Sequence, residues 1–141
     1  MPPLTHFGDA HSIQRIARDW IHYQRLFCAD DPEADAYFES GYERLDKLVR
    51  TSPFLAFEAI KLILHLLADE ADNESICGVL AAGPLEDLLA WHGETMIDAV
   101  EAEARRNEAF RALLRDVWRN SMTSDVWARV QALAGEEQEK R

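Results

Sequence analysis

The side chains that could perform acid–base chemistry lie close together around Glu86. Glu86 and Asp87 are adjacent carboxylates, and His92 follows five residues later. Carboxylates and imidazoles are the groups that general acid–base catalysis uses most often. On a helix, however, His92 shares the apolar face of Leu85, and the two carboxylates point about 100 degrees or more away from it. An enzyme that uses these three residues is one hypothesis. The alternative is that Glu86 and Asp87 only stabilise the first turn of a helix.

A second pattern concerns metal binding. His65 and Asp69 are four residues apart on one face of a predicted helix, and Asp72 or Glu86 could complete the ligand shell. Oxygen ligands favour a hard ion, and one histidine suits zinc or iron less than two would. The chain has no Glu-x-x-His pair, no His-Glu-x-x-His motif and no calcium loop. We therefore predict no resident metal and no cofactor, with His65 and Asp69 as the candidate ligands if a metal binds.

Charge is the strongest feature of the chain. Residues 62–104 contain no lysine or arginine but ten acids, whereas the following segment is rich in arginine. The whole chain has 26 acidic and 15 basic side chains, a formal net charge of −11. This charge repels the phosphates of nucleic acids and anionic lipids. We therefore expect a basic protein as the partner and neither nucleic acid nor a membrane.

Three acids of this segment recur on one helical stripe, namely Glu94, Asp98 and Glu101. Like charges at this spacing cost a few tenths, about 0.2–0.5 kcal/mol, per pair in an isolated helix, so folding alone gives no reason for them. Arg105 can pair with Glu101, which leaves the other two for a basic partner or for a distant arginine. The predicted partner-binding residues are Glu94, Asp98, Glu101, Glu86, Asp87 and Trp91. The alternative is a solvated face that keeps the protein soluble.

Arginines form two further stripes. One consists of Arg111, Arg115 and Arg119, and the other of Arg15, Arg18, His22 and Arg25. Such stripes could clamp a phosphate or an RNA backbone. However, no interleaved aromatic residues accompany them in a basic region, Trp118 could equally face the core, and the whole chain is strongly acidic. We favour arginines that pair with the protein's own acids, and an external anion is the alternative.

Cysteine usage and hydropathy indicate a cytoplasmic protein. Cys28 and Cys77 are the only cysteines and lack the spacing of zinc or redox pairs, so reduced thiols are expected, with Cys77 buried and inert. Residues 1–10 lack the features of a signal peptide. The most apolar run, residues 54–67, is shorter than the roughly 20 residues of a membrane span and includes charged side chains.

These residues are predicted to lie on a purely helical scaffold. Asp31-Pro32, Ser52-Pro53 and Gly83-Pro84 each combine a cap or turn residue with a proline, which is typical of a helix start. No segment shows the alternation of a β-hairpin. We expect an all-α fold, a single compact irregular bundle of seven or eight short helices over residues 11–135. Residues 1–10 are expected to be flexible and residues 136–141 to form a disordered polar tail. Helical-hairpin repeats are an alternative architecture, although no fixed period is present.

Helical spacing also predicts the core and the helix ends. One helix, capped by Ser12, carries Phe27 on its apolar side, and the next, over residues 32–50, buries Phe38, Tyr42, Leu45 and Val49. Gly41 is expected to kink that helix or to admit a close neighbour. Gly83 is expected to end a helix in the left-handed conformation before Pro84 starts the next one, and Gly93 to end that next helix.

The run Leu-Ala-Ala-Gly-Pro-Leu-Glu-Asp-Leu-Leu at residues 80–89, followed by Trp91-His92-Gly93, resembles a motif of a small uncharacterised bacterial domain family. The resemblance extends from about Trp20 to the last helix. It implies a shared all-helical fold and assigns no activity.

Three functions remain open at this level. The favoured hypothesis is a non-catalytic interaction module that binds a basic partner through its acidic face. Its size and charge are similar to those of bacterial immunity proteins, which neutralise nuclease-like toxins by covering a basic active site. The alternative is a metal- or ligand-binding enzyme that uses Glu86, Asp87, His92, His65 and Asp69. The third is a structural subunit that forms homo-oligomers through Trp91, Trp118 and Trp127.

Overall fold

The computed structural model describes residues 5–68 and 73–135, and the regular elements in these residues are all helical, which confirms the predicted all-α class. Seven of the elements in the described ranges are α-helices, in agreement with the predicted seven or eight. The chain divides into two units, residues 1–70 and 71–141. The predicted tail at residues 136–141 lies outside the described residues, and helix α1 begins at Thr5, within the predicted N-terminal segment.

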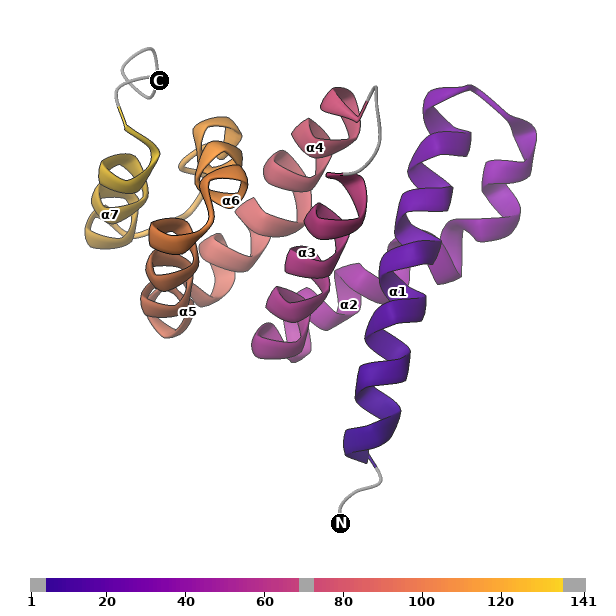
Figure 1. Cartoon of the computed structure of the whole chain (residues 1–141), viewed down its shortest axis with the longest axis horizontal. Helices are drawn as coiled ribbons and strands as arrows, with labels where there is room; N and C mark the ends of the chain where they lie inside the picture. Colours follow the sequence, from indigo (N-terminus) through magenta and orange to yellow (C-terminus); the bar gives the residue numbers. More distant parts are fainter. Residues whose placement is uncertain (1–4, 69–72, 136–141) are drawn as a thin grey trace. The chain divides into compact units, whose positions relative to one another are not determined.

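The first unit contains α1 (Thr5–Cys28), α2 (Arg44–Thr51) and α3 (Pro53–Leu67), and α3 packs against both other helices (Figure 1). Pro53 occupies the first turn of α3, where its missing N–H breaks no hydrogen bond. Because α3 is apolar on nearly all sides, it forms the centre of this unit. Its Ile60 and Ile63 are buried together with Trp20 of α1 and Leu45 of α2.

The connection between α1 and α2 is not the single helix that the sequence predicts. Asp31 accepts a hydrogen bond from the Glu33 backbone N–H and caps a 3-10 helix, Pro32–Tyr37. A single π-helical turn, Glu39–Glu43, follows. Gly41 in this turn is buried, and a Cβ atom there would lie 2.5 Å from the Tyr23 Cβ. Gly41 therefore admits a close neighbour, as predicted, and lets the turn lie directly against α1.

The predicted burial of Phe38 and Tyr42 is wrong, and Phe27, on the predicted apolar side of α1, is exposed as well. Phe27 is 61% exposed, and Phe38 and Tyr42 are 41% exposed each. The 3-10 helix and the π turn change the number of residues per turn, so Phe38 and Tyr42 no longer share a face with the buried residues of α2. The rings of Phe38 and Tyr42 instead stack on each other, with centroids 5.2 Å apart.

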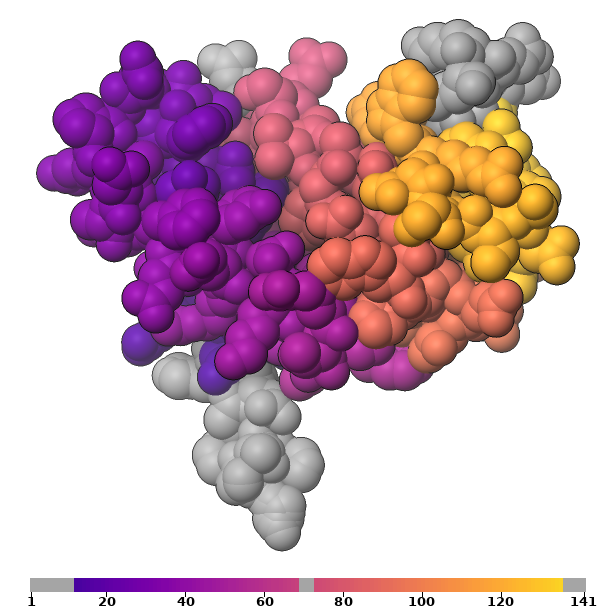
Figure 2. Space-filling view, turned by 180° about the vertical axis from the view of Figure 1, so that it is seen from behind, coloured from indigo at the N-terminus to yellow at the C-terminus, as the bar shows by residue number. Residues whose placement is uncertain are grey.

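The second unit contains α4 (Glu74–Leu80), α5 (Glu86–Arg106), α6 (Glu108–Leu113) and α7 (Ser124–Ala134). Helix α5 packs against α6 and α7, and α6 and α7 contact each other (Figure 1). The atoms of α6 and α7, in orange and yellow, form one continuous surface in Figure 2. Large buried side chains from all three helices fill the space between them, among them Leu89, Met96, Phe110 and Val130.

Two predicted helix ends in this unit are wrong. Gly83 does not adopt the left-handed conformation, because α4 continues through a π turn, Ala81–Leu85, into α5. The wide turn accommodates Pro84, and the Glu86 N–H reaches the carbonyl of Ala81, five residues back. Helix α5 does not end at Gly93 either. It kinks at His92, whose φ and ψ are −130° and 29°, and then continues to Arg106.

Close packing explains why the kink lies beside a glycine. A Cβ atom on Gly93 would lie 3.0 Å and 3.1 Å from the two methyl carbons of Val126. Thr123 caps α7 by accepting a hydrogen bond from the Val126 N–H. The first turn of α7 is thereby held against the kink of α5.

Candidate partner-binding surface on helix α5

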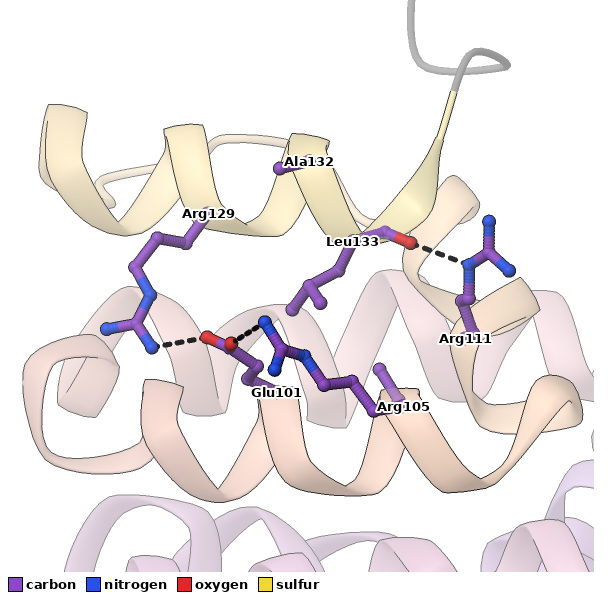
Figure 3. A pocket seen from close by; sticks show the side chains of 7 residues that line it. Glu101, Arg105, Arg111, Arg129, Ala132 and Leu133 are labelled. Carbon is purple, nitrogen blue, oxygen red and sulfur yellow. Dashed lines mark hydrogen bonds and ion pairs between the residues drawn. The ribbon is translucent and has the colours of Figure 1, made fainter.

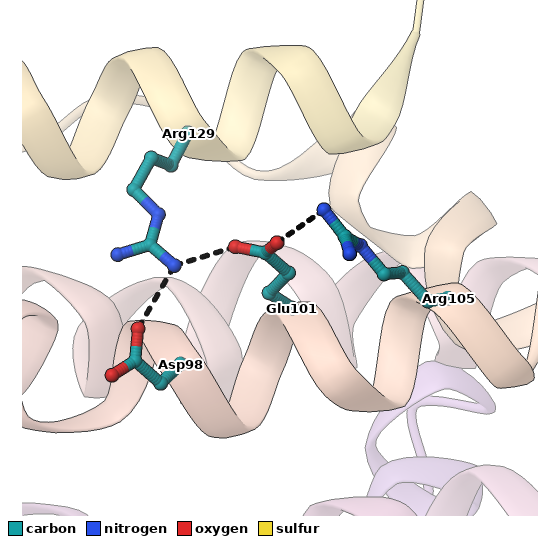
Figure 4. A network of polar contacts seen from close by, with 4 residues as sticks. All are labelled: Asp98, Glu101, Arg105 and Arg129. Atoms are coloured by element: carbon teal, nitrogen blue, oxygen red, sulfur yellow. Dashed lines mark hydrogen bonds and ion pairs between the residues drawn. The ribbon is translucent and has the colours of Figure 1, made fainter.

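Glu94, Asp98 and Glu101 form what we call the α5 acidic stripe, and two arginines bind part of it. Arg129 of α7 donates from Nη2 to Asp98 Oδ1 at 2.9 Å and to Glu101 Oε1 (Figure 4). Arg105, one turn further along α5, binds the other oxygen of Glu101. Arg129 is thus the distant cation that the sequence left open, and the network joins α5 to α7.

The two carboxylates of this network, Glu101 and Asp98, differ in their environment. The hydrogen bond from Arg129 lowers the pKa of Glu101 below its ordinary value, partial desolvation opposes this, and the positive charge of Arg105 adds to the lowering. The same hydrogen bonds raise the pKa of Arg129. The Glu101 side chain is 23% exposed, whereas that of Asp98 is 86% exposed. Glu101 is therefore an internal connection between helices, and Asp98 remains open to solvent.

A hollow of about 530 Å³ lies beside this network, between α5, α6 and α7 (Figure 3). Its lining residues are Glu101, Ala104, Arg105, Arg111, Arg129, Ala132 and Leu133. Arg111 donates from Nε to the backbone carbonyl of Leu133 at 2.9 Å. Three guanidinium groups thus surround the hollow, but each of them already bonds to an oxygen atom of the protein.

The arginine stripe of residues 111–119 holds α7 in place. Arg111 and Arg115 donate from Nε to the carbonyls of Leu133 and Ala134, at 2.9 Å and 3.1 Å. These carbonyls belong to the last turn of α7, where no intrahelical donor is available. Arg119 donates to the Met122 carbonyl at 3.3 Å, just before α7 begins.

The predicted pair of Arg105 with Glu101 is present, and Arg106 and Arg129 also pair with acids of the protein. The sequence also favours such pairs for the stripe of residues 111–119. Such pairing is not the arrangement of Arg111 and Arg119. The first donates to a backbone carbonyl, and the second to a backbone carbonyl and to the Ser124 hydroxyl at 3.2 Å. Carbonyls at helix ends compete with carboxylates for guanidinium donors, and the spacing of the arginines does not distinguish the two acceptors.

Glu86, a predicted site residue, has a structural role. Its two carboxylate oxygens accept hydrogen bonds from the Trp118 backbone N–H at 2.9 Å and from Asn120 Nδ2 at 3.1 Å. Asn120 adopts the left-handed conformation, with φ of 53°, which asparagine tolerates better than most residues. Glu86 therefore fixes the turn that leads into α7, and its neighbour Asp87 is half-buried.

The open part of the surface lies at the kink of α5. Trp91 is 50% exposed there, and Glu94 is also exposed. A hollow of about 310 Å³ is lined by Trp91, His92, Glu94 and Thr95 of α5, and by Thr123 and Val126 on the side of α7. Asp98 follows Glu94 one turn later on the same helix. The structure thus groups an exposed indole, a hollow and two exposed carboxylates.

The residues of the enzyme hypothesis are distributed over several places. His92 lines the hollow at the kink, whereas Glu86 bonds to residues 118 and 120. His65 is exposed on α3 of the other unit, and Asp69 and Asp72 lie outside the described residues. Within residues 5–68 and 73–135, no three His, Cys, Asp or Glu side chains are grouped so that they could hold a metal ion. The enzyme hypothesis stays a prediction.

Cys77 has the properties of an unreactive thiol. It is half-buried, and desolvation raises its pKa, with a further contribution from the negative charge of Asp116. A raised pKa lowers the fraction of thiolate, which is the reactive form. The raised pKa is in the direction expected for an inert thiol, although Cys77 is half-buried and not fully buried as predicted.

Sequence reasoning missed two contributors to this surface. Arg129 was not identified as the partner of Asp98, although it is the only basic residue between residues 120 and 139. Glu103 was counted with the other acids, yet it is 7% exposed and accepts bonds from Arg106 Nε and Asn107 Nδ2 at 2.9 Å and 3.0 Å. The only feature of the sequence that indicates this role of Glu103 is the presence of the polar residues Arg106 and Asn107 three and four positions later.

Comparison with known proteins gives a family and no activity. A model described as a family of unknown function, DUF6869, matches residues 33–138, which include the kink and the whole α5 acidic stripe. No curated protein is significantly similar to the chain. The same is true of the solved structures. Among the described helices, none combines the length and the apolar character that crossing a membrane requires.

Proposed function

We propose that this chain, which belongs to the family of unknown function DUF6869, is a non-catalytic interaction module that binds a basic protein. The binding surface is Trp91, Glu94 and Asp98 of α5, with the hollow at the kink. One observation supports this proposal most strongly: an indole that is 50% exposed lines the same hollow as Glu94, one turn before the 86%-exposed Asp98 carboxylate.

Each part of this surface suits a basic partner. Half-exposed tryptophans are among the side chains that contribute most to binding energy at protein interfaces. Carboxylates at the edge of such an anchor attract a basic protein over a distance and favour its correct orientation. A carboxylate can accept up to about four hydrogen bonds. Among the described residues, Asp98 bonds only to Arg129, through Oδ1, so a partner's arginine or lysine has Oδ2 available.

The surface is smaller than the one that the sequence predicts. Glu101 and Glu86 support α7 and the turn before it, so we assign them a supporting role. Asp87 is half-buried, one helical turn before Trp91. An immunity-type inhibitor in the cytoplasm, one that covers the basic active site of a toxin, would use a surface of this kind, and this is the more specific form of the proposal.

The proposal is tested with three variants, Trp91→Ala, Glu94→Gln and Asp98→Asn. Full-length protein is used to capture its partner from the native host at low salt, and the captured protein is purified. Calorimetry then gives its affinity for each variant at low and high salt. We expect a basic partner whose affinity falls about tenfold or more with Trp91→Ala, because truncating an anchor costs about 2 kcal/mol or more. Each charge-neutralising change should mainly slow association.

The matched control is the double variant Glu39→Gln, Glu43→Gln. It removes two exposed carboxylates from the first unit and leaves α5 unchanged. Equal loss of affinity in the control would show that net charge, and not this surface, governs binding. Capture of no basic protein, or a Trp91→Ala variant that binds like the wild type, would refute the proposal. If Trp91→Ala instead changes the mass of the chain without any partner, the surface serves self-association.

A further inference from the structure

A second hollow, in the first unit, has the opposite charge. It measures about 160 Å³ and is lined by Arg18, Ile21, His22 and Arg25 of α1 and by Leu66 of α3. The three basic side chains recur at i, i+4 and i+7, so they project from one stripe of the helix. None of the lining residues is acidic. A hollow lined only by basic and apolar groups is unexpected in a chain with 26 acids and a net charge of −11.

The folding of the unit does not account for Arg18 in this basic stripe. Within residues 73–135, the arginines of the second unit bond to carboxylates, carbonyls or a hydroxyl, whereas the Arg18 guanidinium makes no hydrogen bond or ion pair with the described residues. Arg25 lies in the last turn of α1, where a cation is favourable for the helix dipole. This effect falls off within one turn. Arg18 lies ten residues before the end of the helix at Cys28, so the dipole does not explain it.

Aromatic and aliphatic side chains pack beside the polar groups of this hollow. The rings of Tyr37 and His22 pack nearly perpendicular to each other, with centroids 4.7 Å apart, which restricts the orientations open to the imidazole. Ile21 is 7% exposed and, with Leu66, supplies an apolar wall. Hydrogen bonds and ion pairs are stronger beside such a wall than in bulk water.

We propose that this hollow binds a phosphoryl group, either free phosphate or a phosphate monoester. Two guanidinium groups can each donate a pair of parallel hydrogen bonds to an oxyanion, and the imidazole N–H can reach a third oxygen. Three converging donor groups match the several oxygens of a tetrahedral phosphate better than the two oxygens of one carboxylate. The small volume admits the phosphoryl group itself and leaves the rest of a monoester outside.

The test is an NMR titration of the full-length chain with inorganic phosphate and, separately, with O-phosphoserine, at an ionic strength held constant with sodium chloride. We expect saturable shifts of the Nε–Hε signals of Arg18 and Arg25 and of the His22 ring signals. Shifts with both ligands, or with only one of them, support the proposal and show whether the free anion or the ester is preferred. No saturable shift with either ligand, or an equal shift with serine, overturns it.

Variants locate the site. Arg18→Gln should weaken binding about tenfold, because a charge-assisted hydrogen bond is lost. Arg18→Lys should have an intermediate effect, since it keeps the charge and loses the planar fork. Arg44→Gln, which removes an exposed arginine of the same unit away from the hollow, is the control and should bind like the wild type. Equal weakening by Arg18→Gln and Arg44→Gln would overturn the proposal. Both positions are exposed, and circular dichroism checks that the three variants fold.

Discussion

At the scale of single residues, side chains of one type have different roles that depend on what packs against them. Glu94 and Glu101 lie on the same stripe of α5, but only Glu101 meets the guanidinium groups of Arg129 and Arg105. Similarly, Trp20 is 1% exposed and belongs to the core, whereas Trp91 is half exposed. A carboxylate or an indole is therefore available for binding only where no neighbouring helix already bonds to it or buries it.

The ion pairs of Glu101 should make the stability of the fold depend on pH. Because the pKa of Glu101 is lowered in the folded protein, its ionised form stabilises the fold above the pKa of the unfolded chain, about 4.3. This stabilisation is lost as the pH falls through the folded pKa. We expect Arg129→Gln to raise the pKa of Glu101 more than Arg105→Gln does, because the Arg129 hydrogen bond is the largest cause of the shift. NMR titration of the Glu101 carboxyl carbon measures both.

Unfolding experiments provide an independent check of this network. The wild type should be more stable than Arg129→Gln at neutral pH, and the difference should shrink as the pH falls below about 4. If the difference were the same at pH 7 and at about pH 3, the Arg129 side chain would act through packing and not through its charge.

At the scale of elements, two of the helix interruptions lie where another helix packs closely. The π turn at Glu39–Glu43 lies against α1, and the kink of α5 lies against the first turn of α7. At both places a glycine allows the contact, Gly41 in the first and Gly93 in the second. Such interruptions depend on the partner helix, so helical periodicity within one segment does not reveal them.

Gly41→Ala and Gly78→Ala should change stability in opposite directions. The new Cβ at residue 41 would lie 2.5 Å from the Tyr23 Cβ and 2.7 Å from the Asp19 carbonyl oxygen, so backbone must move. We expect a loss of about 1–3 kcal/mol. At Gly78, inside α4, a new Cβ would have no atom within 4 Å apart from its chain neighbours and the backbone of its own helix. Alanine there should raise the free energy of unfolding by about 0.5–1 kcal/mol through its higher helix propensity. Chemical unfolding measures both, and a Gly41→Ala protein as stable as the wild type would contradict the close contact.

At the scale of the whole molecule, the two units carry surfaces of opposite charge. The second unit has the exposed carboxylates of α5, and the first has the basic hollow of α1. The chain as a whole remains strongly acidic, with a net charge of −11. Self-repulsion at this charge opposes folding, and the exposed ion pairs offset it only slightly.

Salt should therefore act on stability and on binding in opposite directions. Raising sodium chloride from about 20 mM to about 300 mM shortens the Debye length from roughly 20 Å to below 8 Å. We expect the melting temperature of the protein alone to rise by a few degrees, about 2–5 °C, because repulsion among the excess acids is screened. The affinity for a basic partner should fall over the same range. A melting temperature that falls with salt would show that the ion pairs outweigh the self-repulsion.

The sequence by itself determined the all-α class, most helix starts and the acidic character of α5. Caps such as Asp31 and Thr123 act within a few residues of themselves, and net charge is a sum over residues, so neither depends on tertiary contacts. The tertiary structure decided which acids remain exposed, where α5 kinks, and that a π turn exposes Phe38 and Tyr42. These features depend on atoms brought together from distant parts of the chain, such as Arg129 against Asp98, 31 residues apart. Periodicity within one segment carries no information about such pairs.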